Sequence, residues 1–227
     1  MNSLIHLLHL SDPALPVGGF AHSGGLETYV QAGVVHDAPT SAEFIRNQLE
    51  QNLFYTDGAL VSLAHQAASS GNQGSLIQLS QLCNAVKLPS ELRSAGQKLG
   101  SRLLKIFIHL KQVDLSCDFI SYLQQNASVA HYPVVFGFVA FELGIALVET
   151  LTGFYYNAAA GMVTNAVKLV PLGQLEGQEI LFSLLDLING LAQRSLDVDE
   201  NMIGVCCNGF DIRSMQHEHL YSRLYMS

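Results

Sequence analysis

The apolar residues of this chain recur three or four positions apart in segment after segment, which is the spacing of one face of an α-helix. The valine-rich runs within 131–148 could also form strands, but this segment is too long for one strand and no hairpin signal divides it. The stripes that support this prediction are Leu4, Leu7 and Leu8; Ala42, Ile45, Leu49 and Leu53; Leu92, Leu99, Leu103, Ile106 and Leu110; and Leu181, Leu184, Leu185, Ile188 and Leu191. The chain is therefore predicted to be mainly helical.

Two segments add detail to this helical pattern. Thr40-Ser41-Ala42-Glu43 has the form of a capping box, which predicts a helix start at Thr40. The stretch 131–148 is apolar nearly all round, as a helix buried in a core would be, and Pro133 suits its first turn. Short connections are expected near residues 71–74, 87–89 and 171–173. We predict an all-α, single globular bundle-like domain of about nine or ten helices.

Composition points to buried surfaces between proteins. Apolar residues make up 49% of the 227 residues and charged residues 13%, against ~25% charged in typical globular chains. The longest uncharged stretches, 119–141 and 150–167, contain Gln, Asn and His and have no basic flanks, so a large partner interface is favoured over a membrane span.

Charge and cysteine content exclude further classes. The net charge of −8 comes without a basic run, which argues against nucleic acid as a partner. Four cysteines without a framework pattern suit a reducing compartment, and the first residues lack a basic n-region, so we expect a cytoplasmic protein without a secretory signal.

The segment 11–27, SDPALPVGGFAHSGGLE, concentrates two prolines and four glycines between helical stretches. A phosphate-binding loop would need a Lys followed by Ser or Thr after its glycines, and this segment continues with Leu26-Glu27. A serine nucleophile at Ser23 would need a preceding strand and a Gly where Ala21 stands. A shaped surface loop is favoured, and a His22/Ser23 hydrolase remains an unlikely alternative.

Metal-binding and acid–base patterns are incomplete. His6 and His9 are neighbours on one helix face, and His217, His219 and Cys206-Cys207 lie near the end, but none has a zinc spacing. Weak or transient metal coordination by these residues at an interface is the remaining alternative. The acidic residues Asp197, Asp199 and Glu200 are interpreted as a solvent-exposed connection after a helix, not as paired carboxylates for acid–base catalysis.

The chain changes character after Asn208. Its apolar residues there, including Ile212, Met215 and Leu220, do not share one narrow helical face. We interpret 1–208 as the all-α domain and 209–227 as a C-terminal tail that orders against a partner.

Four motifs together resemble the UreF family of urease accessory proteins. They are LPVGGFAHSGGLE in the glycine-rich segment, HYPVVFG at 131–137, NAVKLVPLGQLEGQ at 165–178, and DIRSMQHEHLYSRLYMS at 211–227. Their order and spacing fit the family over essentially the whole chain. Where this chain has Ala21, the family commonly has Ser or a similar small residue.

The resemblance implies a non-catalytic, homodimeric nickel-insertion chaperone. Such a protein would bridge the accessory protein UreD (UreH in some species) and the GTPase UreG, act as a modulator of that GTPase, and support delivery of nickel to apo-urease. It implies no tightly bound cofactor, only transient passage of nickel. A storage chaperone with its own nickel site is the alternative.

The resemblance also indicates which residues would meet partners. The GTPase-facing surface would include Glu27, whose charge could pair with a cation of one GTPase state, together with its neighbours and Lys168; the tail with Arg213 would contact UreD. The implied partner-binding residues are Pro16, Gly18, Gly19, Phe20, His22, Ser23, Gly24, Gly25, Glu27, Lys168, Arg213, Gln216, His217 and Tyr221.

Overall fold

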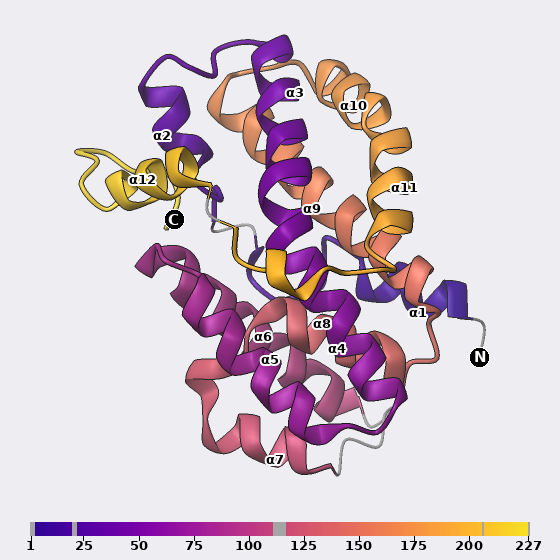
Figure 1. Ribbon diagram of the computed structural model, residues 1–227. Helices are drawn as coiled ribbons and strands as arrows, with labels where there is room; N and C mark the ends of the chain where they lie inside the picture. The colour runs from indigo at the N-terminus through magenta and orange to yellow at the C-terminus, as the bar shows by residue number, and fades with distance from the viewer. Residues whose placement is uncertain (1–2, 20–21, 111–116, 206, 227) are drawn as a thin grey trace.

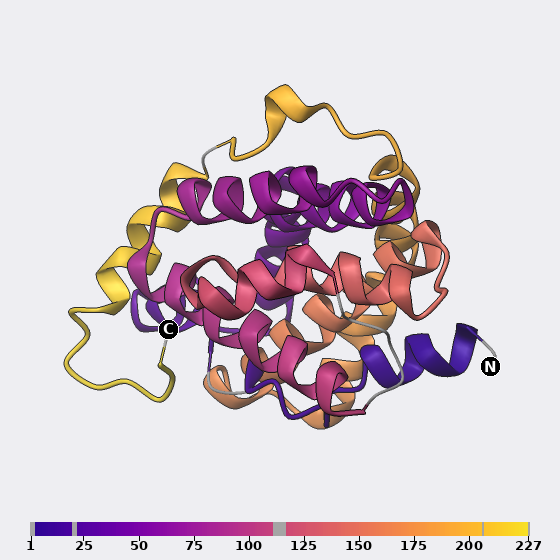
Figure 2. The ribbon, with the colours of Figure 1, turned by 90° about the horizontal axis from the view of Figure 1, so that it is seen from below.

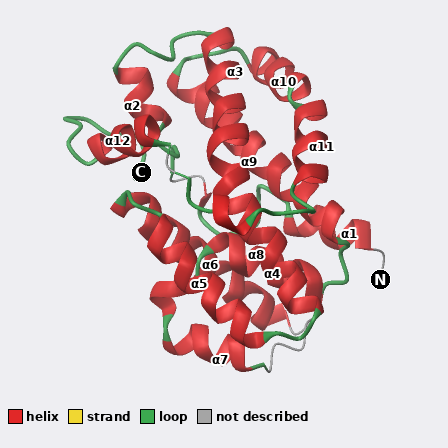
Figure 3. Ribbon diagram, viewed as in Figure 1, coloured by secondary structure: helices red, strands yellow, loops and turns green. Residues whose placement is uncertain are grey.

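A computed structural model describes residues 3–19, 22–110, 117–205 and 207–226 of the chain (Figure 1). All regular structure in these ranges is helical, and no strand occurs in them (Figure 3). The all-α prediction is confirmed. Nine of the described α-helices have ten residues or more, which matches the expected number, and α1, α2 and α7 are shorter.

The elements follow one another with short connections. The α-helices are α1 (Ser3–Leu10), α2 (Leu26–Gln31), α3 (Ala38–Asn47), α4 (Ala59–Ser69), α5 (Gln73–Val86), α6 (Ser90–Leu110), α7 (Asp118–Gln125), α8 (Tyr132–Glu142), α9 (Leu147–Leu169), α10 (Gln174–Ser183), α11 (Leu185–Arg194) and α12 (Asn208–His217). A π-helix, η2 (Gln48–Gly58), joins α3 to α4, and the 3₁₀ turns η3 (Ala127–Val129) and η4 (Glu200–Met202) lie in connections.

The helices form two groups around one hydrophobic core. In Figure 1, α4 to α8 make up the lower part of the molecule, and α2, α3, α9, α10 and α11 make up the upper part. Helix α8 packs between α4 and α6, and α9 packs against α10 and α11. The core runs through both groups and includes the fully buried side chains of Phe107, Phe119, Phe136, Phe138 and Tyr155.

The apolar stretch 131–148 is divided between two helices. Every residue from Pro133 to Ala140 is buried, as the all-round apolar pattern predicts. The expectation of one helix to residue 148 is wrong, because α8 ends at Glu142 and Gly144 takes a left-handed φ of 70° before α9 begins. Glycine adopts this conformation without the penalty that other residues incur, so Gly144 allows the turn.

The start of α3 also differs from the expectation. Asp37, not Thr40, is the N-cap, and its side chain accepts a 2.9 Å hydrogen bond from the Thr40 amide. Thr40 occupies the third helical position of the capping box and its hydroxyl accepts from the Asp37 amide. The helix begins three residues early because Asp is as good a cap as Thr, and Pro39 suits a first turn.

The π-helix η2 is a feature that apolar spacing does not reveal. It carries Asn52 on one turn and the adjacent residues Thr56 and Asp57 on the next, and the Thr56 hydroxyl donates to the Asn52 carbonyl at 2.8 Å. Gly58 ends it where the buried Tyr155 ring lies against the backbone, in space that a Cβ would occupy. The element therefore depends on a close backbone–side chain approach at Gly58.

The C-terminal segment folds on the chain itself. Residues 208–217 form α12, which packs against α2 and α6. In Figure 1 this yellow helix lies beside α2 at one side of the molecule, with α1 on the opposite side. The sequence-based interpretation of 209–227 missed this helix, because its apolar residues do not form one buried face. Some of them are covered by α2, whereas Ile212 and Met215 are exposed.

None of the described helices combines the length and the hydropathy that crossing a bilayer requires. The uncharged stretches are accounted for by core helices such as α8 and α9.

Candidate partner-binding site around Glu27

The glycine-rich segment is held by α12 at the point where α2 begins. Gly25 precedes Leu26, the first residue of α2, and adopts a left-handed φ of 85°. A Cβ at Gly25 would lie 2.8 Å from the Phe210 ring and from the Ser214 hydroxyl of α12. Glycine is thus needed at this position for its backbone conformation and for the approach of α12.

The same segment is tied to α6 and α9. Gly18, with φ 89°, leaves room for the Arg102 guanidinium, which donates to the Val17 carbonyl at 3.3 Å. The Asn165 side chain of α9 donates to the His22 carbonyl at 2.9 Å. Three of the four sequence motifs, those at 15–27, 165–178 and 211–227, therefore meet at one place in the fold, whereas the motif at 131–137 lies in the core.

Glu27 is buried, with 3% of its surface exposed, and its carboxylate binds the C-terminal tail. Its Oε1 accepts the Leu224 amide at 2.7 Å, and its Oε2 accepts the Tyr225 amide at 3.1 Å. Hydrogen bonds to an ionised acceptor are among the stronger ones in proteins. Glu27 therefore anchors the last residues of the tail.

His217 connects Glu27 to a second carboxylate. Its Nε2 lies 3.1 Å from Glu27 Oε2, and its Nδ1 lies 2.7 Å from Glu91 Oε2. Arg223 donates to the other oxygen of Glu91 at 2.8 Å. Both ring nitrogens of His217 therefore face a carboxylate oxygen, and Arg223 places a positive charge beside Glu91.

This group of four side chains, Glu27, Glu91, His217 and Arg223, is hereafter the tail cluster. It joins α2, α6, α12 and the last residues of the chain. His217 is 1% exposed. Removing one partner of the buried Glu27–His217 pair leaves the other without compensation, and breaking a buried pair in this way typically costs about 3–5 kcal/mol.

The remaining predicted residues lie around this cluster or on nearby surface. Ser23 and Gly25 are buried, Gly18, Gly24 and His22 are half-buried, and Pro16, Gly19 and Lys168 are exposed. Arg213 donates to Gln216 within α12 at 3.2 Å, and Tyr221 is fully exposed. Phe20 lies outside the described residues.

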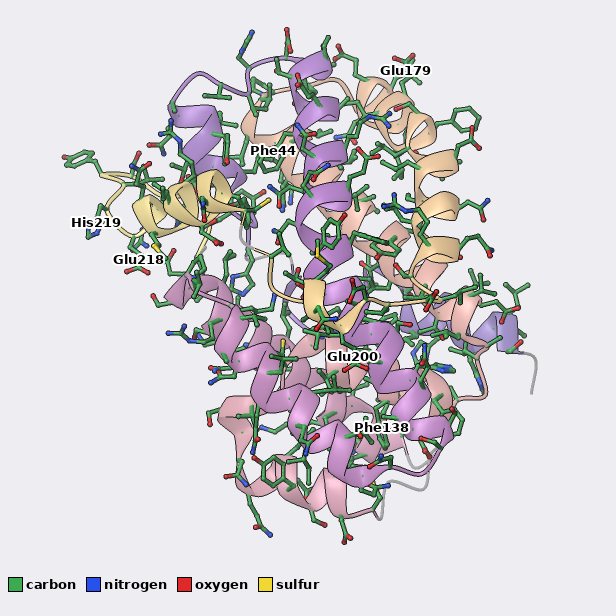
Figure 4. All side chains as sticks on the ribbon, in the orientation of Figure 1. Phe44, Phe138, Glu179, Glu200, Glu218 and His219 are labelled. Atoms are coloured by element: carbon green, nitrogen blue, oxygen red, sulfur yellow. The ribbon has the colours of Figure 1, made fainter. Side chains whose placement is uncertain are left out.

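The histidines do not assemble a metal centre in the described part of the chain, where no group of three or more metal-binding side chains occurs. Both nitrogens of His217 are engaged by carboxylates, and His6 bonds the Leu143 carbonyl at 2.8 Å. Glu218 and His219 directly follow α12 and lie at the edge of the molecule (Figure 4). Burial lowers the pKa of His22, and the charges of Lys98 and Arg102 lower it further.

Sequence reasoning missed Glu91 and Arg223 as parts of the site. Glu91 looked like an ordinary acidic residue in a first helical turn, where it is favoured by the helix dipole. The scarcity of cations could have drawn attention to Arg223, because the chain has only 11 Lys and Arg residues.

Fold and site together define an all-helical protein whose distinctive residues shape a surface and hold a tail. Comparison with known proteins is consistent with this class. The UreF family model matches residues 35–185. Urease accessory protein UreF of Actinobacillus pleuropneumoniae is 47% identical over 227 residues, which is all of both chains.

Two further relatives carry the same name. Urease accessory protein UreF of Haemophilus influenzae is 47% identical over 221 residues, covering 97% of this chain and 94% of its own. That of Bacillus sp. is 32% identical over 228 residues, covering all of both. The chain belongs to the UreF family of urease accessory proteins, as its motifs predicted, and its role lies in urease maturation.

Proposed function

We propose that this chain bridges the accessory protein UreD (UreH in some species) and the GTPase UreG, and so couples GTP hydrolysis to nickel delivery into apo-urease. In this role it performs no catalysis of its own. It acts as a homodimer in the cytoplasm, and nickel passes it only as cargo.

The observation that carries this proposal is the tail cluster. We assign binding of the GTPase to the glycine-rich segment and binding of UreD to the tail. The two segments are joined at the Glu27 carboxylate, whose Oε1 lies 2.7 Å from the Leu224 amide nitrogen. A scaffold influences two partners when each binds one arrangement of a shared element more tightly than the other. The tail and α2 form such an element, because neither can move without breaking the contacts of Glu27.

Two observations support the remaining parts of the proposal. Exposed large apolar side chains, among them Leu175, Phe182 and Tyr221, offer surface for several partners. Cys83 and Cys117 are free thiols, which suits a reducing compartment.

The experiment is reconstitution from purified components. The chain, UreD and UreG with GTP and magnesium are expected to co-elute as one complex, and omission of the chain is expected to separate UreD from UreG. Deletion of residues 218–227 is the matched variant, because it removes the part of the tail that Glu27 binds and keeps α12, and it is expected to abolish co-elution with UreD. Co-elution of UreD and UreG without the chain would refute the bridging role.

A nickel-storage function is the second candidate, and the tail cluster argues against it. Binding of nickel by His217 would require loss of its bonds to Glu27 and Glu91. Nickel titration of the wild-type chain should therefore give no stoichiometric sub-micromolar site.

A further inference from the structure

The outward side of α6 carries a row of positively charged side chains. Lys98, Arg102 and Lys105 follow one another at spacings of four and three residues, which places them on one side of the helix. All three residues are exposed, whereas the opposite side of α6, with Gly100 and Phe107, is buried. The group of Lys98, Arg102 and Lys105 is hereafter the basic stripe.

Such a row is unusual in this chain, which has 11 Lys and Arg residues and a net charge of −8. Helix α6 holds four of these cations and a single acid, Glu91. Glu91 is already engaged by His217 and Arg223 in the tail cluster. The sequence shows no basic run because uncharged residues separate the cations, and only the helix brings them onto one face.

The basic stripe is not neutralised within the described part of the chain. None of its three residues forms an ion pair with a carboxylate there. Arg102 donates to the Val17 carbonyl at 3.3 Å, and its guanidinium has further N–H donors for a carboxylate. The stripe therefore presents its positive charges to another molecule.

The basic stripe borders the glycine-rich segment. In Figure 2 the indigo segment between α1 and α2 runs alongside the C-terminal half of α6, where Arg102 bonds Val17. His22 lies close enough for the stripe to act on it, because the charges of Lys98 and Arg102 add to burial in lowering its pKa. The stripe is thus continuous with the surface that we assign to the GTPase.

The spacing of the cations defines the shape of a matching partner. From Lys98 to Lys105 the stripe extends about 10 Å along the helix axis, at ~1.5 Å per residue. Carboxylates at positions i, i+4 and i+7 of a second helix have the same spacing and the opposite charge. A nucleic acid suits the molecule less well, because the net charge of −8 repels a polyanion.

We propose that the basic stripe binds an acidic helix of a protein partner, whose carboxylates pair with Lys98, Arg102 and Lys105. The inference rests on the proposed function in one respect, namely that UreG, the partner assigned to the adjoining glycine-rich segment, supplies this helix. Because the charges are exposed, their pairing speeds association and weakens as salt is added.

The first test reverses two charges of the stripe. The double variant Lys98→Glu with Lys105→Glu is expected to increase the Kd for UreG by about 10-fold or more and to reduce its dependence on salt. The matched control is Arg46→Glu, at an exposed cation of α3, which is expected to change neither. An unchanged Kd in the double variant, with wild-type binding intact, would overturn the proposal.

A second measurement examines the stripe without UreG. The probes are an alanine-based helical peptide with glutamates at positions i, i+4 and i+7, the same peptide with glutamines, and oligothymidylate. In titrations of the full chain at low ionic strength, the glutamate peptide is expected to cause saturable amide NMR shifts in α6. The glutamine peptide is expected to cause none, and the double variant is expected to show none with either peptide.

The two measurements separate this proposal from the proposed function. If the wild-type chain does not bind UreG, the proposed function fails, and the basic stripe is then judged by the peptide titration alone. Equal shifts with the glutamate and glutamine peptides, or in wild type and the double variant, would overturn the acidic-helix site even if UreG binds. Tighter binding of oligothymidylate than of the glutamate peptide would also overturn it, in favour of a nucleic acid.

Discussion

At the scale of single residues, Glu27 has two consequences for the tail. Its carboxylate satisfies the amides of Leu224 and Tyr225, and it contributes one of the two negative charges beside His217. The sequence indicates that Glu27 matters, because it ends the glycine-rich motif. Its partner could not be predicted, since residues 27 and 224 are brought together only by the tertiary fold.

Replacing Glu27 by Gln keeps the size of the side chain and removes its charge. We expect Glu27→Gln to release the tail, because charge-assisted bonds worth about 1.5–3 kcal/mol are weakened. Hydrogen exchange at the Leu224 and Tyr225 amides should accelerate about 10-fold or more, while exchange in α8 stays unchanged.

Glu43→Gln is the control for this substitution, because Glu43 is an exposed acid of α3. Equal protection of the Leu224 amide in Glu27→Gln and Glu43→Gln would show that Glu27 does not anchor the tail.

A second residue, His131, gives the stability of the chain a dependence on pH. It is fully buried, and its Nε2 lies 3.1 Å from the Asn84 side-chain oxygen. Burial, with a smaller effect of Lys87, lowers its pKa from 6.5 to about 4. Between these values the unfolded chain binds more protons, so the stabilisation is complete above the upper value and is lost as pH falls to the lower one.

We expect His131→Gln, which keeps a donor near Asn84, to reduce the slope of unfolding free energy against pH. The reduction should approach about 1.4 kcal/mol per pH unit in this window. Urea unfolding of wild type, His131→Gln and the exposed-site control His109→Gln would measure it. An unchanged slope in His131→Gln would contradict a neutral, buried His131.

At the scale of elements, periodicity predicted where helices lie better than where they begin or end. The spacing of Leu92, Leu99 and Leu103 corresponds to α6, and the connections near 71–74, 87–89 and 171–173 are confirmed. The residues at which helices begin and end depend on single residues, such as the N-cap Asp37 before α3 and the turn residue Gly144 after α8. The π-helix η2 and the helix α12 escaped prediction because tertiary contacts, at Tyr155 and α2 respectively, stabilise them.

The glycine pair before α2 offers a matched test of how α12 docks. Gly24 and Gly25 both have positive φ, but only Gly25 faces α12; a Cβ at Gly24 would meet open space. We expect Gly24→Ala to lower stability by about 1 kcal/mol through backbone strain, and Gly25→Ala to lower it by more.

Limited proteolysis of the two variants should separate strain from displacement. Gly25→Ala is expected to expose α12 and the tail to cleavage, because Phe210 and Ser214 must move away from the added methyl group. Equal cleavage in Gly24→Ala and Gly25→Ala would indicate that α12 does not depend on this contact.

At the scale of the whole molecule, the helical core supports a surface on which distant parts of the sequence meet. The resemblance to the UreF family suggested two partner surfaces, one near Glu27 and one on the tail. Tail and glycine-rich segment are in contact in the fold, so a partner that moves one must affect the other. The shared surface therefore supports a coupled rather than an independent effect of the two partners.

The most direct measurement is the Kd of the GTPase UreG for the chain, determined with and without saturating UreD, in wild type and in Glu27→Gln. The proposal predicts that UreD changes this Kd about 10-fold or more in wild type, and that the ratio approaches one in Glu27→Gln. The same ratio in both proteins would contradict coupling through the Glu27-anchored tail.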